Sequence, residues 1–191
     1  MSGESKASGG DWLIGADRRA LATRRIVSVA TEMVASHGWD NFDIDSLAAR
    51  AHCSRATIYR NVGGKAQIRE AVFSVAGERI MHAVREAVAP LKGSERLVVA
   101  FLVALDRVRA DPLSDDIVQS FRDTRLAESL IESPRLGLFA GELTGSTTHN
   151  PLAAQWMVRI FVSLLSLPAS DPAVERQLLE DFVAPVLTQL A

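Results

Sequence analysis

One short segment, residues 54–62, carries the side chains that could do chemistry in this chain. Its few apolar residues, Ile58 and Val62, can anchor a helix against a core. The remaining surface of that helix would carry hydrogen-bond donors, namely Arg55, Thr57, Tyr59, Arg60 and Asn61. A helix that lies in a DNA groove needs this division, because it docks through a thin apolar stripe and offers donors to phosphates and base edges. An ordinary surface helical hairpin would show the same periodicity, so the pattern alone leaves both interpretations open.

Short helices are expected to position this segment. Asp43 can cap a buried helix, and Ser54 can begin the next one, which should end at Gly63-Gly64. Only residues 51–54 join the two helices. A long helix is expected from Lys65, where the free N–H groups of the first turn also favour a phosphate.

An amphipathic helix is expected before this hairpin. Apolar residues recur at i, i+3, i+4, i+7 and i+8 from Ile26 to Val34, with Asp17 as the expected N-cap and Gly38 as the stop. Residues 1–16 are rich in Gly and Ser and are expected to form a flexible N-terminal arm.

Charge is distributed unevenly along the chain. The net charge is −2, but residues 18–69 hold nine basic and four acidic residues, whereas residues 70–191 hold eleven basic and sixteen acidic ones. A basic segment followed by an acidic remainder is typical of a nucleic-acid-binding domain attached to a second domain that does not bind nucleic acid. An uneven solvated surface is the other explanation, and charge alone does not decide between them.

The rest of the chain is punctuated by helix starts. Ser94 can cap one helix, and four further positions place a capping residue directly before a proline, which suits the first helical residue: Asp111-Pro112, Ser133-Pro134, Asn150-Pro151 and Asp171-Pro172. The chain has no hairpin signal and no run of alternating strands. We therefore predict an all-α fold of about nine helices.

One ordered set of residues between positions 20 and 72 combines an amphipathic helix, a Gly-aromatic turn and a Thr-x-Tyr…Lys signature. It consists of Arg25-Ile26-x3-Ala30, His37-Gly38-Trp39, Asp43-Ile44-x2-Leu47-Ala48-x2-Ala51 and Ser54-x2-Thr57-Ile58-Tyr59-x5-Lys65. This set resembles the TetR/AcrR family of bacterial transcriptional regulators. The resemblance implies a three-helix helix-turn-helix DNA-binding domain over residues 17–65 and an effector-binding and dimerisation domain over residues 66–191.

The resemblance also implies roles for the donors of residues 54–65. Thr57 and Tyr59 would contact the DNA backbone, and Lys65 would hold a phosphate. Arg55 and Ala56 would lie nearest the bases, with Arg60 and Asn61 completing the DNA-binding set, which is Arg55, Ala56, Thr57, Tyr59, Arg60, Asn61 and Lys65. For Arg55, bidentate readout of a guanine and a simple phosphate contact are both open.

Three positions depart from the family pattern. Asp43 stands where Thr or Ser is usual; it can cap a helix but repels a phosphate. His52 replaces the usual Gly of the turn, so we expect a positive φ there. Val62 stands where Phe is commoner.

The last two helices are expected to form a dimer interface. Residues 156–167 are apolar nearly all round, so one side can face the core and the other must meet a second chain. The final helix carries an apolar stripe too wide for a solvent-facing terminus. The expected two-fold interface comprises Trp156, Ile160, Leu164, Leu167, Leu178, Phe182 and Val186. A purely intramolecular core is the alternative.

The resemblance implies a small-molecule effector pocket among the middle helices. Its candidate residues are His82, Phe101, Leu105, Phe121, Arg122, Arg125, Phe139 and Trp156. Core packing is the competing role of each. The predicted function is a ligand-responsive repressor that binds a palindromic operator as a homodimer. A helical ligand-binding or scaffold protein that has lost DNA binding is the alternative.

Other functional classes lack the residues that they need. The single cysteine, Cys53, excludes an intramolecular disulfide, and the four histidines have no short-spaced partner, so we expect no metal and no cofactor. Gly63-Gly64-Lys65 lacks two residues of a phosphate-binding loop. Residues 97–105, the longest apolar run, are too few to span a bilayer, and no signal-peptide core is present. We expect a cytoplasmic protein without catalytic activity.

Overall fold

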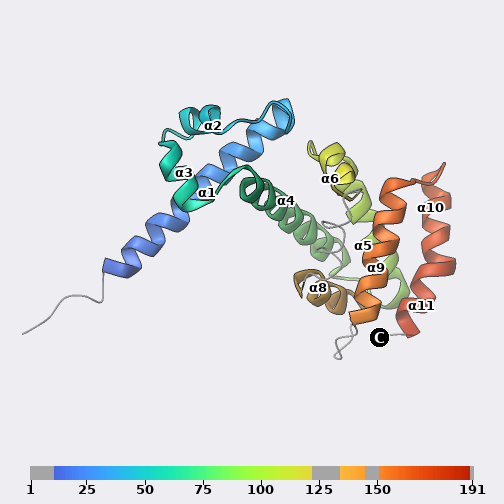
Figure 1. Cartoon of the computed structure of the whole chain (residues 1–191). Helices are drawn as coiled ribbons and strands as arrows, with labels where there is room; N and C mark the ends of the chain where they lie inside the picture. Colours follow the sequence, from blue (N-terminus) through green and yellow to red (C-terminus); the bar gives the residue numbers. More distant parts are fainter. Residues whose placement is uncertain (1–10, 122–133, 145–150, 190–191) are drawn as a thin grey trace, which may run out of the picture. The chain divides into compact units, whose positions relative to one another are not determined.

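The computed structural model describes residues 11–121, 134–144 and 151–189, and these fold as helices with no strand among them (Figure 1). The all-α prediction is confirmed. The chain divides into two compact units, Met1–Val75 and Ala76–Ala191. The first contains α1 (Asp11–His37), α2 (Ile44–Arg50), α3 (Arg55–Asn61) and the start of α4 (Lys65–Val88). The second contains the rest of α4, then α5 (Gly93–Arg109), α6 (Ser114–Phe121), α8 (Pro134–Thr144), α9 (Pro151–Ser166), α10 (Pro172–Leu178), a π-helical turn (Leu179–Val183) and α11 (Ala184–Gln189).

Helix α1 forms as its apolar spacing predicts, although it is longer than expected. Ile26, Ala30 and Val34 are buried on one face, and the helix ends at His37 before Gly38, whose φ is +72°. The helix begins at Asp11, so Asp17 lies inside it and is not its N-cap. The last six residues of the expected arm, 11–16, are helical.

The first unit packs around the turn that follows α1. Trp39 and Phe42 are buried there with an edge-to-face ring contact of 5.0 Å between centroids. The ring centroid of Phe73 in α4 lies 6.3 Å from that of Trp39, again edge to face. Leu47 of α2 and Ile58 of α3 are fully buried in the same unit. Each short helix therefore contributes at least one apolar anchor to a shared core.

Helix α5 is the centre of the second unit. It packs against α6, α8, α9 and α11 (Figure 1), and its own residues are correspondingly apolar. Leu97, Val98 and Phe101 are buried in a cluster with Met157 of α9 and Leu187 of α11.

Two of the expected helix starts in the second unit were also wrong. Helix α5 begins at Gly93, with Lys92 as N-cap, rather than after Ser94. Helix α6 begins at Ser114, two residues beyond Pro112. Asp111 does not cap it through a proline: its carboxylate accepts the Leu113 amide at 2.9 Å and the Arg79 guanidinium at 3.0 Å.

The other proline boundaries agree with the structure where it describes them. Asp171 caps α10 and accepts the Ala173 amide, with Pro172 as the first helical residue. Helices α8 and α9 begin at Pro134 and Pro151. Their expected caps, Ser133 and Asn150, lie outside the described residues.

A buried ion pair joins three helices of the second unit. Glu175 of α10 is only 5% exposed, and both of its carboxylate oxygens accept hydrogen bonds of 2.8 Å from Arg109 of α5. Arg109 also donates to the Leu164 carbonyl of α9 at 3.0 Å. These hydrogen bonds lower the pKa of the Glu175 carboxyl below its ordinary value, although burial opposes the shift. The pair fixes α10 against α5.

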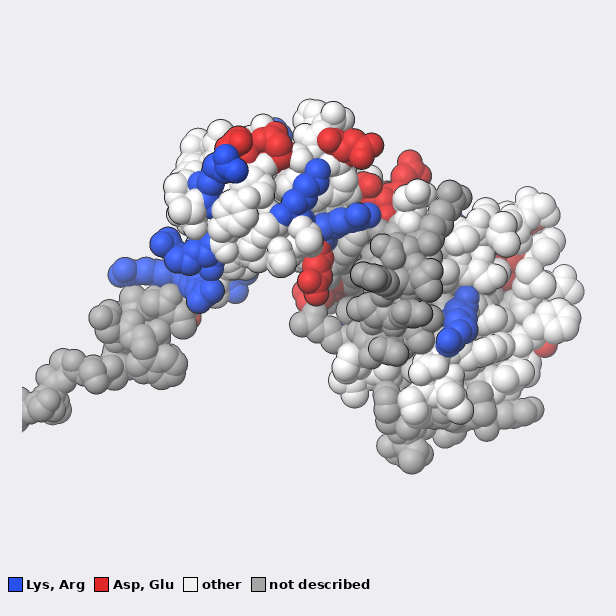
Figure 2. All heavy atoms as spheres, in the orientation of Figure 1, with Lys and Arg blue, Asp and Glu red and all other residues white. Residues whose placement is uncertain are grey.

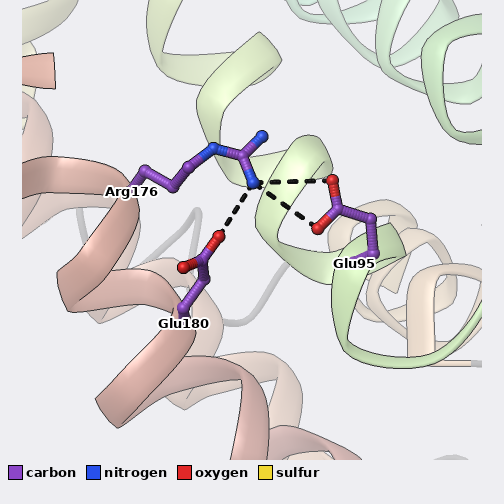
Figure 3. Close-up of polar contacts among 3 residues, drawn as sticks. All are labelled: Glu95, Arg176 and Glu180. Carbon is purple, nitrogen blue, oxygen red and sulfur yellow. Dashed lines mark hydrogen bonds and ion pairs between the residues drawn. The ribbon is translucent and has the colours of Figure 1, made fainter. Parts of the chain in front are cut away.

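A second link between α10 and α5 lies at the surface (Figure 3). Arg176 donates to Glu180, one turn further along the helix, at 2.8 Å and to both oxygens of Glu95 at 3.5 Å. Exposed ion pairs of this kind contribute little to stability. The buried Arg109–Glu175 pair is therefore the stronger polar contact between the two helices.

The buried pair gives a stability prediction. Glu175→Gln removes the negative charge opposite Arg109 and should lower the free energy of unfolding by about 1–3 kcal/mol at pH 7. Since the folded-state pKa of Glu175 is lowered, the wild-type carboxylate contributes fully above its ordinary value of 4.5, and the contribution is lost as the pH falls through the folded-state value. Denaturant unfolding of both proteins should show a difference that shrinks in acid. A difference that is constant with pH would contradict the assignment.

Candidate nucleic-acid interface

Local hydrogen bonds define the start of α2. Asp43 accepts the Ser46 amide at 2.8 Å, as an N-cap does. The hydrogen bonds to the side chain and amide of Ser46 hold the pKa of the Asp43 carboxyl below its ordinary value. The prediction that Asp43 caps this helix is confirmed.

The turn between α2 and α3 requires a left-handed residue, and His52 supplies it. Its φ is +52°. This confirms the positive φ expected because the family pattern usually has glycine at this position. The Cys53 amide donates to the Ala48 carbonyl and the His52 amide to the Ala49 carbonyl. This is the hydrogen-bond pattern of a Schellman motif, whose left-handed position favours glycine. The turn therefore keeps its geometry with a side chain present.

Helix α3 has the buried and exposed sides expected of it. Ser54 caps its N-terminus and accepts the Thr57 amide at 3.1 Å, while Ile58 is fully buried. Tyr59 is 50% exposed. The other predicted contact residues of this helix are exposed or half-buried: Arg55, Ala56 and Arg60 are exposed, and Thr57 and Asn61 are half-buried.

The C-terminal end of α3 is held by side chains of α1. Arg19 donates to the Arg60 carbonyl at 3.0 Å, and Thr23 donates to the Asn61 carbonyl at 3.2 Å. The last carbonyls of a helix have no partner within it, so these two bonds satisfy groups that the short helix leaves open. In the sequence, Arg19 is one of the nine basic residues of positions 18–69 and Thr23 has no distinguishing feature. No local signal connects residues about 40 positions apart.

Lys65 has a structural role that its sequence position does not reveal. Its ammonium donates to the carbonyls of Trp39 and Phe42, each at 3.0 Å, and lies 5.9 Å from the Phe42 ring centroid. Two of its three N–H groups thus tie the start of α4 to the turn after α1.

The two glycines before Lys65 serve the backbone of this junction. Gly63 has a φ of +117°, and a Cβ atom there would lie 2.8 Å from the Cβ of Gln67. The Gly64 amide donates to the Gln67 side chain at 3.0 Å. The positive φ and the tight approach explain the glycine at position 63 without a phosphate-binding loop.

Basic side chains gather on the first unit (Figure 2). Arg18, Arg19, Arg24 and Arg25 are all exposed on the N-terminal half of α1. On the helix-turn-helix itself, Arg55 forms an ion pair of 3.3 Å with Asp45 of α2. Sequence reasoning did not identify Asp45, because the contact depends on how α2 and α3 cross.

The residues expected to line an effector pocket divide between core and surface. Phe101 and Leu105 are buried in the core, and Trp156 packs against it. The His82 side chain is exposed and pairs with Glu86 at 3.4 Å. The Arg85 guanidinium lies 5.0 Å from the centroid of the Phe139 ring. The side chains of Phe121, Arg122 and Arg125 lie outside the described residues.

The expected interface residues fall into two groups. Trp156, Ile160 and Leu164 pack partly against the core of their own chain. The other four, Leu167, Leu178, Phe182 and Val186, are exposed. Across the described ranges, no helix has the length and apolarity to cross a membrane, and no cluster of three metal-binding side chains occurs.

Comparison with known proteins agrees with the helix-turn-helix geometry. Residues 26–72 match the model of the family described as bacterial regulatory proteins, tetR family. An uncharacterised HTH-type transcriptional regulator of Mycobacterium tuberculosis is 30% identical over 190 residues, which cover 95% of this chain and 92% of the relative. The DNA-binding transcriptional repressor TetR of Mycobacteroides abscessus is 41% identical over 48 residues, 25% of each chain.

A solved structure shares the fold of most of the chain. The TetR family repressor AlkX from Dietzia sp., implicated in biodegradation of n-alkanes, superposes with a TM-score of 0.66 at 22% identity, over 88% of this chain and 97% of that one. The architecture is that of a helix-turn-helix transcriptional regulator. The chain belongs to the tetR family of bacterial regulatory proteins, and it is a DNA-binding regulator of that type.

The contacts of Lys65 predict a cost in stability. Lys65→Met keeps the apolar stem but removes two charge-assisted hydrogen bonds, so it should destabilise the first unit by about 1–3 kcal/mol. Faster amide hydrogen exchange in α1–α3 of the full chain would report this. Lys92→Met, an exposed lysine of the second unit, is the matched control. Unchanged exchange in α1–α3 would show that the two bonds do not hold the junction.

Proposed function

We propose that the chain is a ligand-responsive repressor that binds a palindromic operator as a homodimer. The observation that carries the proposal is the division of α3, which is anchored by the buried Ile58 while Arg55, Tyr59 and Arg60 are exposed. An α-helix presented in this way fits the major groove of B-DNA. The alternative, a helical protein that has lost DNA binding, would not need to keep these three donors exposed.

The donors divide by the part of DNA that each would reach. Tyr59, Thr57 and the remaining N–H group of Lys65 would contact phosphates, which position a protein without reading sequence. Arg60 and Asn61 would extend the same backbone contacts, and Ala56 would allow close approach to the bases. Arg55, the first residue of α3, would donate to a guanine.

An exposed apolar stripe supports a homodimer. Val174, Leu178, Phe182 and Val186 recur every four residues along the last helix, and Phe182 is 67% exposed. Leu167, just after α9, is 77% exposed. Contiguous apolar surface of this kind is typical of a protein–protein interface. A second copy would also place two α3 helices about 34–36 Å apart, the spacing of successive major grooves.

A ligand would act through the second unit. Its binding would favour a spacing or tilt of the two α3 helices that no longer matches one turn of DNA. The support is family membership, since the relatives are transcriptional regulators rather than enzymes. A small molecule that lowers operator affinity, with a binding site that maps to the second unit, is the required observation. If no ligand altered operator affinity, this part of the proposal would fail.

The DNA contacts are tested on duplexes enriched by the wild-type protein from a random pool. Tyr59→Phe should weaken binding to all sequences about fivefold, because it removes one phosphate hydrogen bond. Arg55→Ala should instead reduce discrimination at one base pair per half-site by about 1–3 kcal/mol. Fluorescence anisotropy over a salt series measures both, and Arg107→Ala, an exposed arginine of the second unit, is the control. Equal effects on every sequence from both variants would refute direct readout by Arg55.

The dimer is tested by a charge in the apolar stripe. Phe182→Glu should raise the dissociation constant of the dimer by about 100-fold or more, because two carboxylates would be buried at the interface. Analytical ultracentrifugation of the full chain measures the change. Leu21→Glu changes a similarly exposed residue of the first unit and should leave the dimer intact. A dimer equally stable in both variants would place the interface elsewhere.

A further inference from the structure

We propose that Asp45 is a positioning residue that directs Arg55 to a base rather than to a phosphate, and so sets sequence preference at one base pair of each half-site. The inference rests on the proposed role of α3 in DNA recognition. Asp45 belongs to the first turn of α2, and Arg55 is the first residue of α3. The turn between the helices brings the two side chains together at the surface.

The contact leaves one edge of the guanidinium available. Nη1 of Arg55 lies 3.3 Å from Oδ1 and 3.4 Å from Oδ2 of Asp45. Within the described parts of the chain, Nη2 and Nε of Arg55 have no hydrogen-bond partner. These two atoms form one edge of the planar group, and a pair of parallel donors is what O6 and N7 of guanine accept.

The pair is not required for the stability of the fold. The side chains of Arg55 and Asp45 are 58% and 71% exposed, and an ion pair so accessible to water contributes little to stability. Its consequence is local: it restricts the orientation of a long side chain that otherwise has many rotamers. A restricted side chain loses less conformational entropy when it binds.

The carboxylate also changes which DNA group Arg55 meets. A free arginine on a DNA-binding surface is drawn to phosphates, which supply most of the attraction and no sequence information. Asp45 repels a phosphate that approaches its partner, and it repels the uncharged acceptor edge of a guanine far less. Arg60 has no acidic partner among the described residues, so nothing comparable diverts it from the backbone.

The test compares sequence preferences selected in parallel. Wild-type protein and the variants Asp45→Asn, Arg55→Ala and Asp40→Asn each enrich duplexes from the same random pool. Asp45→Asn should flatten the preference at the same base pair that Arg55→Ala flattens, where the wild type discriminates by at least about fivefold. It should also bind non-specific duplex more tightly, with a salt slope steeper by about 0.9 per protomer, because the released Arg55 neutralises a phosphate.

Matched variants separate this effect from a change of net charge. Asp40 is an exposed acid of the same unit, so Asp40→Asn removes an equal charge and should keep the full preference. Asp45→Glu, which retains the carboxylate, should restore part of it. In an Arg55→Ala background, Asp45→Asn should change nothing at that base pair. Melting temperatures verify that each variant is folded.

The outcomes distinguish this inference from the proposed function. Suppose that the wild type enriches sequences, but Asp45→Asn keeps every base preference or loses one at a different base pair from Arg55→Ala. The positioning role of Asp45 is then refuted, while the proposed role of α3 in DNA recognition is unaffected. A sharper preference in Asp45→Asn would likewise refute it, because the pair would then withhold Arg55 from the base. If the wild type enriches no sequence, the proposed function fails first.

Discussion

A seven-residue helix is not stable by itself in water, so the DNA-binding surface proposed for this protein depends on how its surroundings stabilise α3. The Ser54 hydroxyl accepts a hydrogen bond from an amide of the first turn, and the buried Ile58 packs against the core. Side chains of α1 donate hydrogen bonds to the last carbonyls of α3. None of these contacts uses the outward side. The helix is therefore held by contacts that leave the side chains of Tyr59 and Arg60 exposed, which would let it bind DNA without a large loss of conformational entropy.

The second unit combines apolar packing with one buried charge pair. Helix α5 supplies the central apolar surface, and Arg109 at its C-terminal end holds Glu175. The basic side chain also suits the negative end of the α5 dipole. The guanidinium of Arg109 thus stabilises both the negative end of the α5 dipole and the buried carboxylate of Glu175. The same pair holds α10 against α5, and the apolar stripe of the last helix remains exposed.

Sequence reasoning succeeded where a short range of residues determines the structure. The caps Asp43 and Ser54 and the positive φ of His52 follow from local hydrogen bonds and sterics. It failed to find the roles of Arg19 and Lys65, because their carbonyl partners lie 41 and 26 positions away along the chain. The same limit applies to the Arg55–Asp45 pair, which depends on the crossing of two helices. The family resemblance identified Arg55 and Lys65 as candidates for DNA contacts but could not show their protein partners.

The π-helical turn at Leu179–Val183 has a consequence for how the last helix can meet a neighbour. Residues repeating every four positions drift about 40° per step around an α-helix, so a long stripe winds across the surface. A turn that closes from residue i to i+5 admits one additional residue. By ideal helix geometry the additional residue offsets most of the winding between Val174 and Val186, so their side chains should lie more nearly parallel to the axis. The ridge that results can lie along a straight partner helix over its whole length, without either helix coiling about the other.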